Sequence, residues 1–329
     1  MRIATPHGKA WGRLAASLQV AGGIMLAAAL LSGCRSLEEA VFDSGVAISR
    51  SLAGVSVEEV ETDTHGKLSY LYRQGSDKTI VFLHGFAAQK ELWLPLLRQL
   101  PKRYGVVAFD LPGHGASERK PDADYRTGNV VDTLEQALAQ IGTDEFHIMG
   151  ASLGAKIALR YTLRHPEQVN SLALVGPAAF HPPRPSEVEQ MIAEGRNPLF
   201  IQDREDFEML TALLFYEQPF MPWPIAAVLT RRATAAREHR KLMWEELWQH
   251  RQEIRDELAE LSMPVFLLWG EADRVVDVSG VEVFKHHIDA ARLNVVTLEQ
   301  TGHSPMLEKT ATMASEYRSF LGSGHQKAQ

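Results

Sequence analysis

The stretch FHIMGASLGAK (146–156) decides how the chain is expected to fold. A short apolar run precedes Ser152, as in a buried strand, and the residues after it have the pattern of a helix. Gly150 and Gly154 flank the serine in a G-x-S-x-G arrangement, in which glycine lets neighbouring backbone pass close to a tight, strained turn. Such a turn exposes the serine Oγ at a helix N-terminus, where N–H groups stabilise negative charge. The stretch therefore predicts a nucleophilic serine between a strand and a helix.

Similar short apolar runs recur on both sides of this stretch, and they are typical of strands buried on both faces of a sheet. They lie at 79–85, 105–113, 145–152, 171–176, 264–270 and 293–299. An alternating run at 67–74 predicts an early antiparallel strand. Amphipathic stretches of helical length occupy 90–100, 127–141, 154–165, 279–290 and 305–321. The alternation predicts an α/β fold, with a mostly parallel central sheet flanked by helices.

One long interval without a clear strand divides the expected core into residues 56–180 and 261–322. The interval, 181–260, is helix-like and is expected to form a helical cap, or lid. Its large apolar residues are Phe200, Phe207, Leu213, Leu214, Phe215, Tyr216, Phe220, Met221, Trp223, Trp244 and Trp248. The segment YEQPFMPWP (216–224) places prolines among aromatic residues, which makes it a candidate pocket wall.

A nucleophilic serine needs a histidine base and an acid that orients the base. With an elbow of this type the chain order is serine, acid, histidine. Asp273 follows the predicted strand at 264–270, and His303 follows the predicted strand at 293–299. Because α/β sheets build their sites at the carboxyl ends of strands, these residues are predicted to complete a catalytic triad with Ser152. Asp277 is the alternative acid.

The developing oxyanion needs two N–H donors. The N–H of Leu153, directly after the nucleophile, is predicted to be one donor, and the N–H of Phe86, in the loop after the strand at 79–85, the other. His84 and His114 precede the triad in the chain and are predicted to hold loops by hydrogen bonds.

No pattern in the chain indicates a cofactor or a metal site. The glycine-rich turn DLPGHGAS (110–117) matches neither a dinucleotide-binding nor a P-loop fingerprint. His286 and His287 lie on a helical stretch without clustered acidic or cysteine ligands. We therefore expect no cofactor and no metal.

Cys34, the single cysteine among 329 residues, follows a segment with the features of an export signal. Residues 1–33 contain three basic and no acidic residues, an apolar run at 20–31 and a small-residue exit. The run is shorter than the roughly 20 residues of a membrane-spanning helix. LSGC (31–34) resembles the lipobox of bacterial lipoproteins, which implies cleavage before Cys34 and lipidation of Cys34. An uncleaved anchor is the alternative.

This interpretation makes residues 1–33 a signal peptide and residues 34–55 a tether. The protein would be exported and lipid-anchored to a bacterial membrane. Arg35 follows the cysteine, and the resemblance implies that a residue other than Asp there favours the outer membrane, at its periplasmic face or the cell surface. Loss of residues 1–33 would change the formal charge from −7 to −10, which argues against a nucleic-acid partner.

Several blocks of the chain resemble matching blocks of the α/β-hydrolase superfamily. They are FLHGF (82–86), DLPGHGAS (110–117), GASLGA (150–155), WGEAD (269–273) and GHSPMLE (302–308). The segments at 197–210 and 273–280 are similar to those of bacterial cold-active-type lipases and monoacylglycerol lipases. The resemblance implies Ser152 as nucleophile, Asp273 as acid, His303 as base, and Phe86 and Leu153 as oxyanion donors.

The expected activity is hydrolysis of acyl esters, including lipidic esters, through an acyl-enzyme and without a cofactor. One alternative is carbon–carbon hydrolysis of ring-fission products on the same scaffold, which polar or cationic pocket residues would favour over an apolar acyl tunnel. A second alternative is a non-catalytic lipoprotein that binds ligands. Oligomeric state is not predicted by the sequence.

Overall fold

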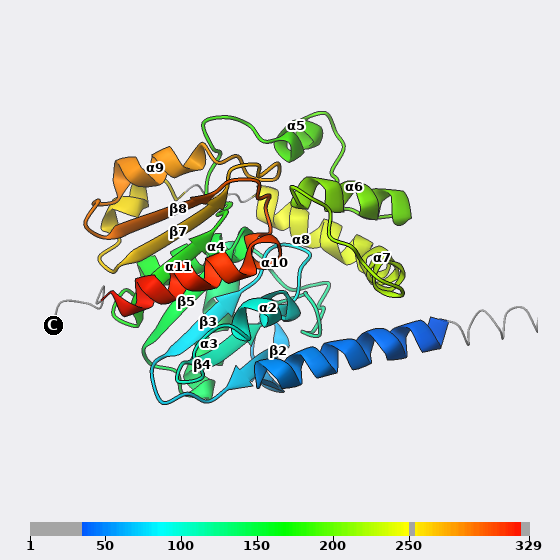
Figure 1. Ribbon diagram of the computed structural model, residues 1–329, viewed down its shortest axis with the longest axis horizontal. Helices are drawn as coiled ribbons and strands as arrows, with labels where there is room; N and C mark the ends of the chain where they lie inside the picture. The colour runs from blue at the N-terminus through cyan, green and yellow to red at the C-terminus, as the bar shows by residue number, and fades with distance from the viewer. Residues whose placement is uncertain (1–34, 250–253, 324–329) are drawn as a thin grey trace, which may run out of the picture.

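The computed structural model describes residues 35–249 and 254–323, and within them an eight-stranded sheet lies at the centre (Figure 1). The strands are β1 (Ser56–Thr62), β2 (Gly66–Arg73), β3 (Thr79–Leu83), β4 (Gly105–Phe109), β5 (Phe146–Ala151), β6 (Val169–Val175), β7 (Val265–Gly270) and β8 (Leu293–Leu298). Their spatial order is β1-β2-β4-β3-β5-β6-β7-β8. β2 pairs antiparallel with β1 and β4, and every later pairing is parallel. The predicted α/β fold is confirmed.

Helices cover both faces of the sheet because successive side chains of each strand point to opposite faces. In β3, Val81 and Leu83 join one hydrophobic cluster, whereas Ile80 and Phe82 join another. The first cluster includes residues of α3 (Thr127–Ile141), α4 (Leu153–Arg164) and α9 (Gly280–His287). The second includes residues of η1 (Lys90–Trp93), α2 (Leu94–Leu97), α10 (Pro305–Glu308) and α11 (Thr310–Gly322). Each fully buried aliphatic or aromatic side chain contributes about 1.5–3 kcal/mol, so the two clusters hold the sheet rigid under the site.

Between β6 and β7, the described residues form four helices and a short 3₁₀ helix over the part of the chain predicted to be the cap. They are α5 (Glu187–Ala193), α6 (Arg204–Leu214), α7 (Ile225–Ala235), α8 (Arg237–Gln249) and η2 (Asp256–Glu260). In Figure 1, α5 to α8 group together to the right of the sheet. Ser186 and Glu189 form a capping box that starts α5, and Asp203 caps α6. Ile201, Phe207, Leu210 and Ala233 form a small core of their own.

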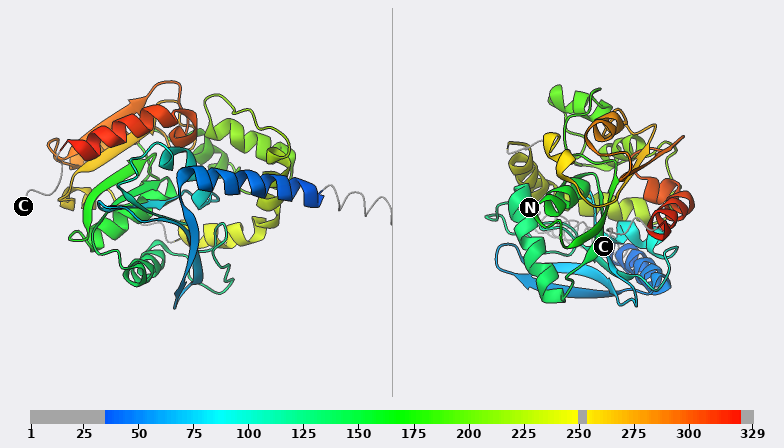
Figure 2. Two further views of the ribbon diagram at one scale, coloured as in Figure 1. Left: turned by 60° about the horizontal axis from the view of Figure 1, so that its bottom comes forward. Right: turned by 90° about the vertical axis from the view of Figure 1, so that its left-hand side faces the viewer.

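The segment expected to be a tether is instead a helix over residues 35–53 (Figures 1 and 2). Its less exposed residues, such as Glu39, Phe42, Val46 and Ala53, recur at three- and four-residue spacing, so one helix face lies against the protein. Arg50 binds Glu91 on η1. Nearer the start of the helix, acidic side chains form ion pairs with arginines of α7. These ion pairs join Arg231 to Glu38 and Glu39, and Arg232 to Glu39 and Asp43.

No helix within the described ranges is both long and apolar enough to span a membrane. Residues 1–33 and Cys34, with the predicted signal and lipidation site, lie outside the described part of the chain.

The edge strand β1 was not predicted from the sequence. Its residues are mostly polar, and most of them are exposed at the edge of the sheet.

Candidate active site

Ser152 occupies the sharp turn between β5 and α4, with φ 53° and ψ −115°. The glycines on either side are there for steric reasons. A Cβ on Gly150 would lie 2.3 Å from the carbonyl oxygen of Gly154, and one on Gly154 would lie 2.2 Å from that of Leu83. Both distances are far below van der Waals contact, so larger residues would force the backbone apart. The strand–turn–helix context predicted for Ser152 is confirmed.

Asp273 and His303 lie beyond the carboxyl ends of β7 and β8, and their side chains meet. The Nδ1 of His303 is 2.7 Å from Oδ2 of Asp273. Oδ1 of Asp273 accepts hydrogen bonds from the N–H groups of Val275 and Val276, at 2.8 and 2.9 Å. The side chain of Asp273 is 1% exposed and that of His303 is 9% exposed. Both carboxylate oxygens are thus satisfied in a nearly dry site, which fixes the imidazole ring.

Asp277, the alternative acid, is engaged elsewhere. Its Oδ1 accepts hydrogen bonds from the N–H of Ser279 at 2.8 Å and from Nε of Arg184 at 3.2 Å. It therefore caps the turn before α9. Of the two candidate acids, Asp273 is the one that contacts His303.

Gly176, at the end of β6, lies directly against the acid–histidine pair. Its φ is +48°, and a Cβ there would lie 3.1 Å from Oδ2 of Asp273 and 3.2 Å from Nδ1 of His303. The residue therefore combines a left-handed backbone with a close approach, and both favour glycine.

Ser152, Leu153, Phe86 and His303 all line one cavity of about 1330 Å³ between the sheet and the helices α5 to α8. The hydrogen bonds of the described residues do not include one between Ser152 Oγ and His303. Such catalytic contacts commonly tighten only when substrate binds. The predicted residues are thus brought to one cavity, with the acid directly behind the histidine.

The loop after β3 passes close to the serine. A Cβ on Gly85 would lie 3.2 Å from Cβ of Ser152. The ring of Phe86 packs edge-on between His114 and Trp244 of α8, with centroid distances of 5.6 and 5.5 Å. Ala87 has a φ of 61°, a left-handed conformation that costs about 1–3 kcal/mol for a non-glycine residue. Other contacts must hold this loop in place.

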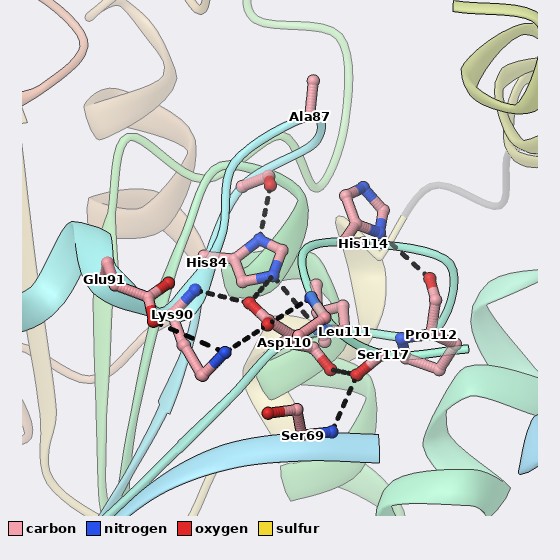
Figure 3. Close-up of polar contacts among 12 residues, drawn as sticks. Ser69, His84, Ala87, Lys90, Glu91, Asp110, Leu111, Pro112, His114 and Ser117 are labelled. Atoms are coloured by element: carbon pink, nitrogen blue, oxygen red, sulfur yellow. Dashed lines mark hydrogen bonds and ion pairs between the residues drawn. The ribbon is translucent and has the colours of Figure 1, made fainter. Parts of the chain in front are cut away.

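A buried ion pair behind the loop supplies such contacts (Figure 3). Nζ of Lys90 donates to Oδ2 of Asp110 at 2.6 Å, and the N–H of Lys90 donates to Oδ1 at 2.7 Å. The N–H of Ala116 also donates to Oδ2, at 2.8 Å. The side chains of Lys90 and Asp110 are almost fully buried. A second carboxylate, that of Glu91, lies 3.4 Å from Nζ of Lys90. The loop that leads into η1 is therefore fixed to the turn after β4.

His84 is the hydrogen-bonding link between the same two loops, as predicted. Its Nδ1 is 2.7 Å from the carbonyl oxygen of Gly85, and the N–H of Leu111 donates to its Nε2 at 3.0 Å. Because Nε2 accepts, the proton must be on Nδ1, which donates to Gly85. Burial lowers the pKa of His84 to about 4, and burial together with nearby His84 lowers the pKa of His114 to about 3. Both rings are therefore neutral near pH 7 and serve as structural groups.

Glu308 ties the histidine loop to the α6–α7 connection, and sequence reasoning did not single it out. Oε1 accepts from the N–H of Gly302 at 2.8 Å, and Oε2 accepts from the N–H of Tyr216 at 2.7 Å. The N–H of His303 itself donates to the carbonyl oxygen of Leu214, at the end of α6, at 2.9 Å. The position of the catalytic candidate therefore depends on α6 as well as on β8.

The described residues contain no group of three or more side chains suited to hold a metal ion. Nδ1 of His287 is 2.8 Å from the carbonyl oxygen of Val283, within its own helix.

Comparison with known proteins agrees with this architecture. A family model described as alpha/beta hydrolase fold matches residues 78–310. Monoacylglycerol lipase ABHD6 of Mus musculus is 30% identical over 78% of this chain and 79% of its own length. Lipase 1 of Psychrobacter immobilis is 30% identical over 73% of this chain and 76% of its own length.

A similar solved structure is that of a membrane phospholipase A, described as a bacterial virulence factor. It superposes with a TM-score of 0.85 at 36% identity, covering 93% of this chain and 98% of that one. Fold, family match and relatives agree, and the chain belongs to the alpha/beta hydrolase fold family.

Proposed function

We propose that the protein is a serine hydrolase of lipidic carboxylic esters that uses Ser152, His303 and Asp273 as its triad. The observation that carries the proposal is the Asp273–His303 pair, whose histidine lines the same cavity as Ser152 on its strained turn. The lipase relatives support ester hydrolysis as the reaction class.

In the proposed mechanism Ser152 Oγ attacks the ester carbonyl while His303 Nε2 takes its proton. Asp273 keeps the other imidazole proton on Nδ1 and stabilises the imidazolium that forms. The N–H groups of Phe86 and Leu153 stabilise the oxyanion, each worth about 100- to 1000-fold in rate. The tetrahedral intermediate collapses, and His303 gives its proton to the departing alcohol. Water, deprotonated by His303, then attacks the acyl-enzyme. The second tetrahedral intermediate collapses as His303 returns its proton to the Ser152 oxygen, which releases the acid and restores the free serine.

The shape of the cavity favours substrates with an acyl chain. Much of its wall is apolar, and on the α5–α6 side it includes Ile192, Leu199, Ile201, Phe207, Leu210 and Leu214. Phe180 and Phe215 continue this surface toward the sheet. Burial of each methylene contributes about 0.8 kcal/mol, so a wall of this size can select chain length strongly. The names of the monoacylglycerol lipase, lipase and phospholipase A relatives are consistent with lipidic esters as substrates.

A chain-length panel tests this function. We expect kcat/KM for p-nitrophenyl esters to rise from acetate to octanoate by about threefold or more per two methylenes, since each buried methylene contributes up to ~0.8 kcal/mol. Monoacylglycerols of the same acyl chains should also be cleaved, as measured by fatty-acid release. Activity that is near zero for every ester, with turnover of 2-hydroxy-6-oxo-6-phenylhexa-2,4-dienoate, would instead assign the chain to carbon–carbon hydrolysis.

We also propose that Cys34 is lipidated and that this anchors the hydrolase at a bacterial membrane, the outer membrane being favoured by Arg35. Support comes from the export-signal pattern of residues 1–33 and from the small residues Ser32 and Gly33 before Cys34. Phe220 and Trp223, on the α6–α7 connection, are 90% and 64% exposed, and Trp223 also lines the cavity. Aromatic side chains of this kind suit a bilayer interface near a substrate entrance.

Metabolic labelling with a radioactive or alkyne-tagged fatty acid tests the anchor. Wild-type protein expressed in a bacterial host should incorporate the label and sediment with membranes. The Cys34→Ala variant should incorporate none, because it lacks the thiol. Equal labelling of the two proteins would rule out lipidation at Cys34.

A further inference from the structure

Arg240, on α8, brings a guanidinium group to the cavity wall beside the loop that carries Phe86. It lines the cavity, and its Nη2 donates to the carbonyl oxygen of Ala87 at 3.2 Å. Ala87 is the residue directly after Phe86. A group bound by Arg240 would therefore lie beside the loop whose Phe86 N–H is the proposed oxyanion donor.

Four of the other basic side chains that line the cavity already have partners. Arg50 pairs with Glu91, Lys90 with Asp110, and Arg232 with Glu39 and Asp43. Lys156 also has a polar partner. Among the described residues that line the cavity, Arg240 and Arg119 form no ion pair with a carboxylate.

The acidic side chains that line the same cavity cannot supply the missing charge. Asp43 and Glu91 are the partners of Arg232 and Arg50. Glu189 binds the backbone N–H of Ser186 and lies 3.1 Å from Nδ1 of His181. The carboxylates that line the cavity are therefore all engaged elsewhere, and Arg240 and Arg119 have no counter-charge among them.

An arginine in this position keeps its charge. Burial, with a smaller effect from nearby Arg119, lowers the pKa of Arg240 to about 10, so the group is still protonated at pH 7. Arg240 is partly buried, where a cation without a counter-charge is less well solvated than at the surface, and a guanidinium matches the two oxygens of a phosphate or carboxylate. An anionic group on a ligand would supply that counter-charge.

We propose that Arg240, assisted by Arg119 at the rim, forms an anion subsite that binds the phosphate of an acyl ester of glycerol phosphate. This rests on the proposed ester hydrolysis and names its substrate class. The acyl chain lies along the apolar α5–α6 wall, and the phosphate, on the alcohol side of the ester, lies against α8.

Two substrates with the same acyl chain test the subsite: 1-decanoylglycerol and 1-decanoylglycerol 3-phosphate. The measured quantity is the ratio of kcat/KM for the phosphate ester to that for the neutral ester. Hydrogen bonds to charged groups are worth about 10- to 150-fold, so Arg240→Gln should lower this ratio by about 10-fold or more. Arg240→Lys keeps the charge and should retain part of the ratio. Arg119→Gln should lower it less.

Lys241→Gln is the matched control. It removes a positive charge from the next residue of α8, where Lys241 pairs with Glu238 and does not line the cavity. It should leave both rates and their ratio unchanged. Urea unfolding of each variant shows whether the fold is intact.

Other outcomes would overturn the subsite. If Arg240→Gln lowers both rates equally, Arg240 only positions the Ala87 loop. If inorganic phosphate inhibits cleavage of the neutral ester in wild type but not in Arg240→Gln, while the ratio is unchanged, the site takes a free anion and the headgroup assignment is wrong. If wild type cleaves neither ester, the proposed function itself fails, which is a result distinct from both.

Discussion

Replacement of Ser152 by alanine is expected to lower kcat for p-nitrophenyl butyrate by about 10⁴-fold or more. The loss of a nucleophilic serine removes the acyl-enzyme route altogether, and only the oxyanion donors and substrate binding remain. Stability should not fall, because the turn is held by glycine sterics and by the bond from the N–H of Ser152 to the carbonyl oxygen of Val175 at 2.9 Å. Both features survive in alanine. Initial rates and a urea unfolding curve measure the two quantities.

The matched control is Ser319→Ala, which removes a hydroxyl from an exposed position of α11. It should retain full activity. A fluorophosphonate probe should label wild type and Ser319→Ala but not Ser152→Ala. Undiminished turnover by a folded Ser152→Ala protein would refute the assignment of the nucleophile, whereas a wild-type protein that neither turns over esters nor reacts with the probe would revive the non-catalytic interpretation.

The second large effect is expected for Asp273→Asn, at about 10⁴-fold in kcat. The two oxygens of Asp273 accept from three N–H donors, those of His303, Val275 and Val276. An asparagine has one acceptor oxygen. If that oxygen faces the two backbone donors, its NH₂ group faces Nδ1 of His303 and forces the proton onto Nε2. The imidazole then has the wrong tautomer to accept the serine proton.

Asp277→Asn distinguishes this role from that of a general carboxylate near the site. Asp277 contacts Arg184 and the N–H of Ser279, and an amide oxygen can replace the latter contact. The kcat of the Asp277→Asn variant should stay within about threefold of wild type, because the ion pair that it removes, Arg184–Asp277, lies at the surface and is worth less than about 1 kcal/mol. A large loss in Asp277→Asn with a small one in Asp273→Asn would reverse the acid assignment.

The parts of the fold that the sequence predicted well are those determined by local pattern. The runs at 79–85 and 264–270 correspond to β3 and β7, since strands buried on both faces must be apolar throughout. The stretch at 127–141 coincides with α3. The turn at Ser152 was predictable because its two glycines are imposed by contacts within a few residues and with the neighbouring strand.

Two elements at the edge of the molecule were missed, each for its own reason. β1 alternates only weakly, because just Val60 and Thr62 of its seven residues are buried. The helix at 35–53 has short, mixed side chains, and its position depends on ion pairs with α7, almost 200 residues away. Partners so distant in sequence leave no periodic signal.

The same limit applies to the site. Asp273 and His303 were found because chain order and strand ends predicted them together. Lys90, Glu308 and Arg240 were not, since each acts through a contact with a loop that only the folded chain brings near. From the sequence alone Lys90 would be expected at the surface, and only the fold shows that it pairs with Asp110 in the interior.

That buried pair restricts how this sequence can change over time. The carboxylate of Asp110 accepts two hydrogen bonds from Lys90 and one from Ala116. Loss of the Lys90 side chain would leave this carboxylate buried without its counter-charge, which would lower the free energy of unfolding by about 3–5 kcal/mol. The loss of Asp110 would leave the ammonium group of Lys90 with Glu91 alone, a carboxylate that Arg50 already shares, behind the loop that carries Phe86. Neither position can drift alone without weakening both the folded state and the geometry around Ser152. Descendants of this chain are therefore expected to keep the pair or to exchange both residues together.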